Sequence, residues 1–229
     1  MSSRKTMLTD IPSSDFVDRW KEWIFGIQQV IVEGLQQYDE VEFVQNKWKR
    51  HDGNGDGIAC ILENGTTFEK AGVNTTQLQI PLSKGIYKTM SDQNHLKTIS
   101  ENEVDEYEMF ACGVSLVIHP HNPHVPTVHA NYRVLMVLRK EDQEIEDWWF
   151  GGGSDLTPIY LHTADAIHFH TVLKAACDKY DEEFYPKFKQ KADDYFYIKC
   201  RKEHRGVGGI FYENLNDRSF EELFGFAKS

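Results

Sequence analysis

The stretch GVSLVIHPHNPHVPTVHANYR, residues 113–133, decides the fold, because it predicts two strands that turn back on each other through a proline-rich loop. Its three prolines are poorly tolerated inside a strand, and apolar and β-branched residues flank them. We therefore expect strands over residues 110–119 and 127–139. Further strands are expected over residues 58–62, 77–82, 148–150 and 209–212. Consecutive strands with mostly short connections favour an antiparallel sheet.

Helical spacing of apolar residues precedes and follows these strands. An amphipathic first helix, capped by Ser13 or Ser14, is predicted by the spacing of Phe16, Trp20, Trp23, Ile27, Val30, Ile31 and Leu35. Later helices are expected over residues 163–180 and 186–198. A helix, then a block of strands, then more helices indicate an α+β fold.

A last helix is predicted from a capping-box signature at Ser219 and Glu222. The sequence ends at Ser229, soon after an apolar face formed by Phe220, Leu223, Phe224 and Ala227. Two interpretations stay open. The helix docks on the core formed by the preceding chain, or it packs against further protein that once followed it.

Bulk composition narrows the class of protein. The chain has 229 residues and a formal net charge of -11, so nucleic acid and anionic membranes are poor partners. The four cysteines form no CxxC pair and suggest no disulfide framework. No apolar run approaches the roughly 20 residues of a membrane helix. We expect a soluble cytoplasmic protein, or a mitochondrial one if a leader has been removed.

The two strands around the proline loop place polar residues on one face. Side chains alternate along a strand, so Ser115 and His119 share a face of the first strand, and His129, Asn131 and Arg133 share a face of the second. Tyr132 lies on the opposite face. Paired as a hairpin, the strands form either a binding site or the solvent side of a sheet.

Asp155 follows an aromatic and glycine-rich segment, WWFGGGSD, residues 148–155. A carboxylate held against aromatic walls is a candidate general base, because burial favours its protonated form; the alternative is a cap of a turn or helix. His168 and His170 form an HxH pair, but on the helix expected there they diverge. The pattern of an EF-hand calcium loop is matched by Asp52, Asn54, Asp56, Gly57 and Glu63. The turn at Asn64-Gly65 and the strand expected over 58–62 argue against calcium binding, because an EF-hand needs an exiting helix there.

The segments 113–133 and 148–158, together with FEKAGVN at 68–74 and RGVGGIF at 205–211, resemble the oxygen-dependent coproporphyrinogen III oxidases. The resemblance implies one domain over residues 1–229, with a large antiparallel sheet flanked by helices on both faces, working as a homodimer. It implies oxidative decarboxylation of two propionates of coproporphyrinogen III in haem biosynthesis. Molecular oxygen is the co-substrate, and no flavin or nicotinamide motif is present.

Individual positions also carry implied roles. His129 takes the proton-donor position, and Asp155 that of a carboxylate meeting the pyrrole nitrogens. Substrate-binding positions fall on Ser115, Asn131, Tyr132 and Arg133. Metal-ligand positions of bacterial relatives fall on His119, His129 and His170, but the fourth is Cys200 in place of histidine, which argues against a required metal.

The family is expected to continue past the residue matching Ser229, with a Gly-Gly-Arg substrate-binding segment and much of the dimer contact. Two hypotheses follow from this departure. The chain is such an oxidase, or it is a catalytically deficient fragment that still binds porphyrinogen.

Overall fold

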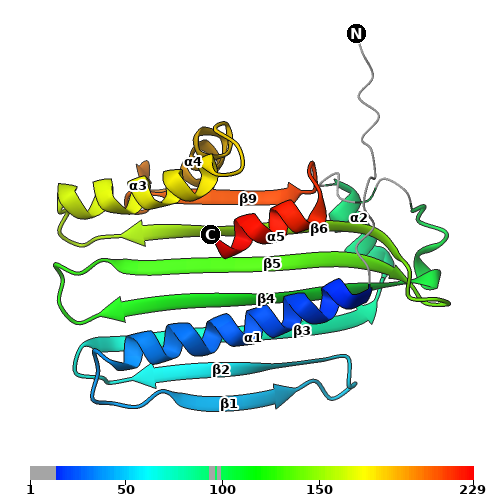
Figure 1. Ribbon diagram of the computed structural model, residues 1–229, viewed down its shortest axis with the longest axis horizontal. Coiled ribbons are helices and arrows are strands. Elements are labelled where there is room, and N and C mark those ends of the chain that lie inside the picture. Colours follow the sequence, from blue (N-terminus) through cyan, green and yellow to red (C-terminus); the bar gives the residue numbers. More distant parts are fainter. Residues whose placement is uncertain (1–13, 93–95, 97–98) are drawn as a thin grey trace, which may run out of the picture.

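The computed structural model describes residues 14–92, 96 and 99–229, and its main feature is a seven-stranded antiparallel sheet (Figure 1). The sheet runs in the order β1-β2-β3-β4-β5-β6-β9. Its strands are β1 (Val44–Lys49), β2 (Gly55–Glu63), β3 (Phe68–Pro81), β4 (Tyr107–Pro120), β5 (Thr127–Arg139), β6 (Ile145–Thr157) and β9 (Gly209–Leu215). A separate small sheet pairs β7 (Tyr197–Ile198) with β8 (Glu203–His204). The first six strands pair with their neighbours in chain order, as their mostly short connections predict; the exception is the long segment between β3 and β4.

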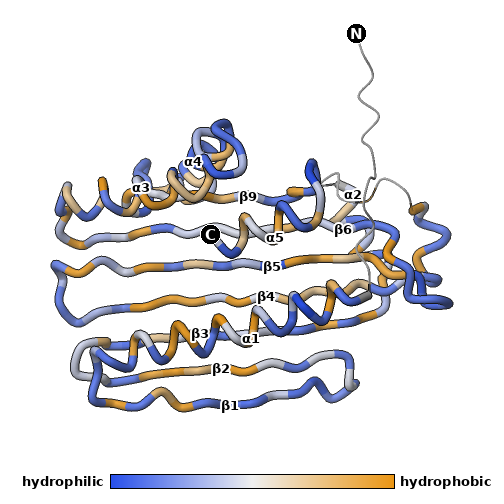
Figure 2. Tube along the Cα trace, in the orientation of Figure 1, coloured by the Kyte–Doolittle hydropathy of each residue, from blue (hydrophilic) through white to orange (hydrophobic). Residues whose placement is uncertain are grey.

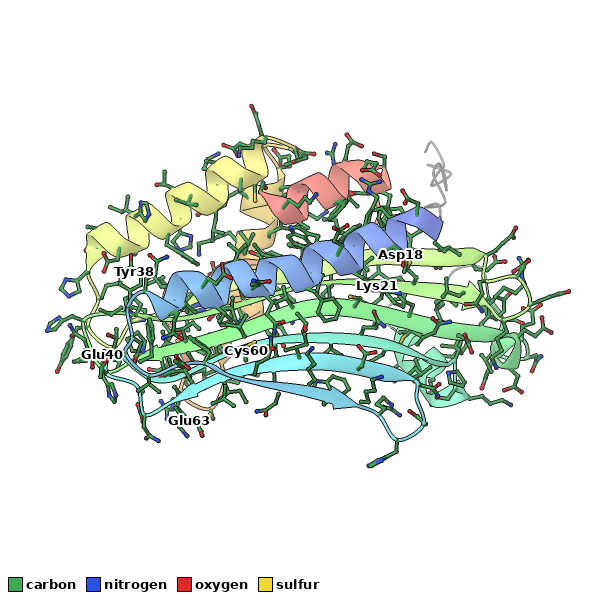
Figure 3. The ribbon with its side chains drawn as sticks, turned by 60° about the horizontal axis from the view of Figure 1, so that its bottom comes forward. Asp18, Lys21, Tyr38, Glu40, Cys60 and Glu63 are labelled. Atoms are coloured by element: carbon green, nitrogen blue, oxygen red, sulfur yellow. The ribbon has the colours of Figure 1, made fainter. Side chains whose placement is uncertain are left out.

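Helices cover the two faces of the sheet unequally. The helices are α1 (Ser14–Gln36), α2 (Lys84–Asp92), α3 (Thr163–Asp178), α4 (Phe184–Tyr195) and α5 (Phe220–Lys228), with a 3₁₀ turn at Val104–Glu106. In Figures 1 and 3, α1 and α5 lie on the same side of the sheet, and Cys60 of β2 lies beneath α1. The main core on this side includes Trp20, Val134 and Phe188. The opposite face has a smaller core, in which residues of α2 pack against Val137 and Trp149.

Hydropathy follows this layering. Figure 2 shows hydrophobic residues along the central strands and hydrophilic ones at many of the hairpin turns. Trp148 and Trp149 are neighbours in β6, yet Trp148 belongs to the main core and Trp149 to the smaller one, because successive side chains point to opposite faces. Within the part of the chain that the structure describes, no helix is both long and apolar enough to cross a membrane.

The C-terminal helix docks on the core formed by the preceding chain, as the first interpretation of its apolar face expects. Its buried residues are Phe220, Leu223, Phe224, Phe226 and Ala227. Phe224 packs edge-on against Phe16 of α1, and Phe220 lies against Phe150 of β6. The capping box at Ser219 and Glu222 is present as predicted. The apolar face is thus covered by the preceding chain.

The predicted elements are confirmed with longer strands. The bounds of β5 agree with the expected 127–139, whereas β3 and β6 extend well beyond the expected 77–82 and 148–150. Strand β1 and helix α2 were not predicted. The EF-hand match is overturned, because residues 55–63 form strand β2 instead of a loop and exiting helix. Ser13, one of the two expected caps, lies outside the described residues.

Candidate active site

We call the face of the sheet opposite α1 and α5 the open face. Its best-defined feature is a chain of three hydrogen-bonded side chains, those of His129, Asp155 and Arg205. Strand pairing sets His129 of β5 directly opposite Asp155 of β6. Nδ1 of His129 lies 2.7 Å from Oδ1 of Asp155, and Arg205 donates from a guanidinium nitrogen to Oδ2 at 2.7 Å. Asp155 is only 1% exposed. Both of its oxygens are thus occupied, as a buried carboxylate requires.

This chain of bonds fixes the imidazole. With Nδ1 bonded to Asp155, Nε2 is the ring nitrogen of His129 available to a ligand. Phe196 stands edge-on to the His129 ring, and the Arg205 guanidinium lies over Phe196 at 4.2 Å from the ring centroid. Asp155 is buried and bonded through both oxygens, and its expected contact with a ligand stays a prediction.

A second group on the same face is built around Arg133. Its guanidinium donates to Oδ1 of Asn131 at 2.5 Å and to Oε1 of Glu213 at 2.8 Å. It lies flat against Gly151, where a Cβ would stand 3.1 Å from Cζ, Nε and a terminal nitrogen of Arg133. Such a contact is tighter than ordinary packing. The absence of a side chain at position 151 therefore makes room for the cation.

Each glycine of the GGG run makes room for a different neighbour. Gly151 accommodates Arg133 on the open face. Gly152 accommodates the hydroxyl of Tyr212 on the core side, at 2.7 Å from where a Cβ would stand. Gly153 accommodates the backbone of β9 at Ile210. The run is thus explained by close approach of neighbours, as expected for glycine in a strand.

Two lobes of a groove meet at the Arg133–Glu213 ion pair. The first, which we call the polar lobe, has a volume of about 210 Å³ and is lined by His129, Asn131, Phe196 and Phe211. The second, which we call the α2 lobe, has a volume of about 370 Å³ and is lined by Ile86, Thr89, Met90, Leu135 and Trp149. Arg133 and Glu213 line both lobes. One lobe therefore offers polar chemistry and the other an apolar wall.

Two expected substrate-binding residues are placed differently from each other. Ser115 pairs with Asn131 across β4 and β5, so it lies on the open face with the cluster. Tyr132 points to the covered face, where its hydroxyl lies 2.6 Å from Oγ of Ser154. Burial raises the pKa of Tyr132. Its side chain is thus not brought together with the other site residues, because neighbours along a strand face opposite ways.

The histidines at metal-ligand positions do not converge. The ring of His170 on α3 is bonded through Nε2 to the Val207 carbonyl and through Nδ1 to the Tyr185 hydroxyl. His119 lies near the end of β4, with Nδ1 3.4 Å from the Thr127 hydroxyl. Among the described residues, no three His, Cys, Asp or Glu side chains form a group that could hold a metal ion. These residues do not fit a shared metal site.

Sequence reasoning missed two charged members of the site. Arg205 stands in the RGVGG segment that carried the resemblance, but no role was assigned to it. Glu213 lies one residue beyond the strand expected over 209–212, and alternation with Phe211 would have placed it on the open face. Both residues come from the segment after α4, which the strand pattern around the proline loop does not reach.

The fold and site together define an α+β protein in which a histidine bonded to a buried aspartate and an arginine paired with a glutamate share the open face of an antiparallel sheet. Residues 19–229 match the family described as coproporphyrinogen III oxidase. The chain belongs to that family, which confirms the resemblance seen in its motifs.

Known proteins of this kind are similar along nearly the whole chain. The human mitochondrial oxygen-dependent coproporphyrinogen-III oxidase is 44% identical over 207 residues, which cover 90% of this chain and 44% of the human one. The mouse protein of the same description is 42% identical over 232 residues, covering 100% and 51%. An oxidase of the same kind from Francisella tularensis subsp. holarctica is 40% identical, covering 92% and 67%. The chain thus spans about half the length of the mammalian relatives.

Proposed function

We propose that this site carries out the oxygen-dependent oxidative decarboxylation of coproporphyrinogen III. For each propionate carboxylate converted to a vinyl group, the substrate loses carbon dioxide, one proton and two electrons, and a second proton comes from water. Oxygen takes up the two electrons and two protons and leaves as hydrogen peroxide. The observation that carries the proposal is the shared face of His129 and Arg133, which brings a proton-transfer group beside a carboxylate-binding group.

Each residue then has a defined task. Arg133 binds a propionate carboxylate, and Asn131 and Gly151 hold its guanidinium in place. His129 exchanges a proton with the substrate through Nε2. Asp155 and Arg205 keep the His129 ring oriented. The aromatic residues Phe196 and Phe211 exclude water from the polar lobe, which strengthens electrostatic interactions there.

The proposal also covers the co-substrate, cofactors, assembly and compartment of the protein. Oxygen is the only co-substrate, and neither an organic cofactor nor a metal is required; the failure of the three histidines to converge supports this for the metal. A homodimer is the proposed assembly, by resemblance to the family. The proposed compartment is the cytoplasm, with the mitochondrion as the alternative, because the mammalian relatives are described as mitochondrial.

Turnover of anaerobically prepared coproporphyrinogen III, started by adding oxygen, tests the proposal. We expect His129→Ala and Arg133→Ala each to lower turnover by at least about tenfold, the lower range for one positioned proton-transfer or charge-stabilising group. His168→Ala is the matched control, because this exposed histidine on α3 lies outside both lobes. Near-normal turnover in both site variants overturns the assignment. Absence of turnover in the unchanged chain, with porphyrin binding retained, favours the deficient fragment.

A further inference from the structure

The Arg133–Glu213 ion pair occupies the place where a ligand carboxylate has to bind. Arg133 is held independently by Gly151 beneath it and Asn131 beside it. The side chain of its third contact, Glu213, is 44% exposed, and that of Arg133 is 31% exposed. An ion pair this exposed to water contributes little stability. Loss of Glu213 from the pair would therefore leave the cation in position.

A β-bulge follows Glu213, which faces the groove two residues after Phe211. Tyr212 pairs with Gly152 and Leu215 with Phe150, so Glu213 and Asn214 together stand opposite Gly151. Asn214 has φ of 59°, a left-handed conformation that asparagine tolerates better than most residues. The extra residue returns Leu215 to the core, whereas alternation from Glu213 would have placed it on the groove side. Bulges beside active sites commonly redirect a side chain in this way.

Glu213 is also the carboxylate that a ligand meets first. Asp155 is buried and both of its oxygens are bonded, whereas Glu213 lines both lobes. A carboxylate approaching Arg133 is therefore repelled by Glu213 until the ion pair opens. Because this pair stands where the two lobes meet, its opening also joins the polar lobe to the α2 lobe.

We propose that Glu213 is a displaceable partner of Arg133: a substrate carboxylate takes its place on the guanidinium, and one ligand then spans both lobes. The identity of that ligand as a porphyrinogen rests on the proposed function. The exchange itself requires only a carboxylate ligand large enough to reach from the polar lobe into the α2 lobe. Glu213 thus sets the affinity for the carboxylate without being needed to hold Arg133.

Binding of coproporphyrin III, the stable oxidised tetracarboxylate, tests this exchange by fluorescence titration. We expect Glu213→Gln to tighten binding about three- to tenfold at low ionic strength, because a competing charge is removed from Arg133. The gain shrinks at high salt. Glu63→Gln is the matched control, since Glu63 also pairs with a cation, Lys70, but at the β2–β3 hairpin away from the groove. This control is expected to bind as the unchanged chain does.

A double-mutant cycle separates competition from a general effect of charge. In an Arg133→Ala background, Glu213→Gln is expected to leave the affinity unchanged, because no cation remains to compete for. Weaker binding by Glu213→Gln, the same gain in the Arg133→Ala background, or no binding by any variant overturns the exchange. Turnover is measured separately. Tighter binding without turnover refutes the proposed function alone, and turnover without the gain refutes the exchange alone.

Discussion

Two buried aspartates show how single carboxylates organise this protein. Asp155 is hydrogen-bonded by two side chains on the open face, whereas Asp39 is hydrogen-bonded mainly by the backbone. The Asp39 oxygens accept N–H groups from Val41, Thr66, Thr67 and Phe68. Burial works to raise the pKa of Asp39, but these four bonds outweigh it and hold the pKa well below its usual range. Asp39 thereby fastens the segment after α1 to the β2–β3 turn.

Asp39→Asn is expected to lower the melting temperature by several degrees at neutral pH, because one acceptor oxygen becomes an NH₂ group facing N–H donors. The folded-state pKa lies below the unfolded value of about 3.9, so the stabilisation is present above that pH and is lost as the pH falls toward the folded pKa. Urea unfolding from pH 7 to pH 3 should show the gap between variant and parent narrowing below about pH 4. Asp18→Asn, an exposed change on α1, is the control. A gap independent of pH would contradict this account.

Residue-level reasoning predicted the polar face but not every contact on it. Strict alternation was sufficient to place His129, Asn131 and Arg133 together and Tyr132 behind them, because a strand has a fixed period of two. Alternation says nothing about partners from distant segments. The burial of Asp155 depends on Arg205, which is 50 positions away in the sequence. The contact between Asp155 and Arg205 cannot be predicted from strand alternation, because it depends on the path of the chain after α4.

Among the elements, α5 best illustrates how a local signal and the tertiary core support each other. Oγ of Ser219 accepts the backbone N–H of Glu222, and the Glu222 carboxylate accepts the backbone N–H of Ser219. A nine-residue helix is marginal by itself. Its five buried side chains provide the remaining stabilisation.

Ser219→Ala is expected to lower the free energy of unfolding by about 1 kcal/mol, the usual cost of losing an N-cap acceptor. Ser219→Asn keeps an acceptor oxygen at the cap and should stay within a few tenths of a kcal/mol of the parent. Equilibrium urea unfolding of the three proteins measures both values. Equal stability of all three would mean that core packing alone holds α5.

Elements with strong periodicity were predictable, and those that depend on their neighbours were not. The strand over 127–139 and the first helix have clear patterns, and both are found where expected. Helix α2 contains Gly85 and only a short apolar face, and it is held by packing of Ile86, Tyr87 and Met90 in the smaller core. Strand β1 is almost wholly exposed and forms by pairing with β2, which its own sequence does not reveal.

At the scale of the whole molecule, the accessibility of the four cysteines shows which parts of the fold are closed to solvent. Cys60, Cys112 and Cys177 are buried, and Cys200 is exposed. Burial raises the pKa of Cys112 and Cys177 to about 12 and that of Cys60 above its usual value. Thiols rarely ionise under such conditions and react slowly.

The folded protein is therefore expected to show one fast-reacting thiol toward a disulfide reagent at pH 8, and all four after unfolding in guanidinium. Cys200→Ser should abolish the fast phase and leave the slow one unchanged. Absorbance of the released thiolate measures both phases. A second fast thiol in the folded state would show that one of the three buried cysteines is accessible.

The opposite orientations of Trp148 and Trp149 give the protein two optical probes one residue apart. Trp148 lies against Phe220 of α5, so its emission depends on the packing of the main core. Trp149 lines the α2 lobe, so its emission depends on the smaller core and on any ligand held there. Because the sequence contains five tryptophans, the spectrum of each single Trp→Phe variant is subtracted from that of the parent to give the emission of the replaced indole. The adjacent pair thus allows the two sides of one sheet to be followed independently during unfolding and during ligand binding.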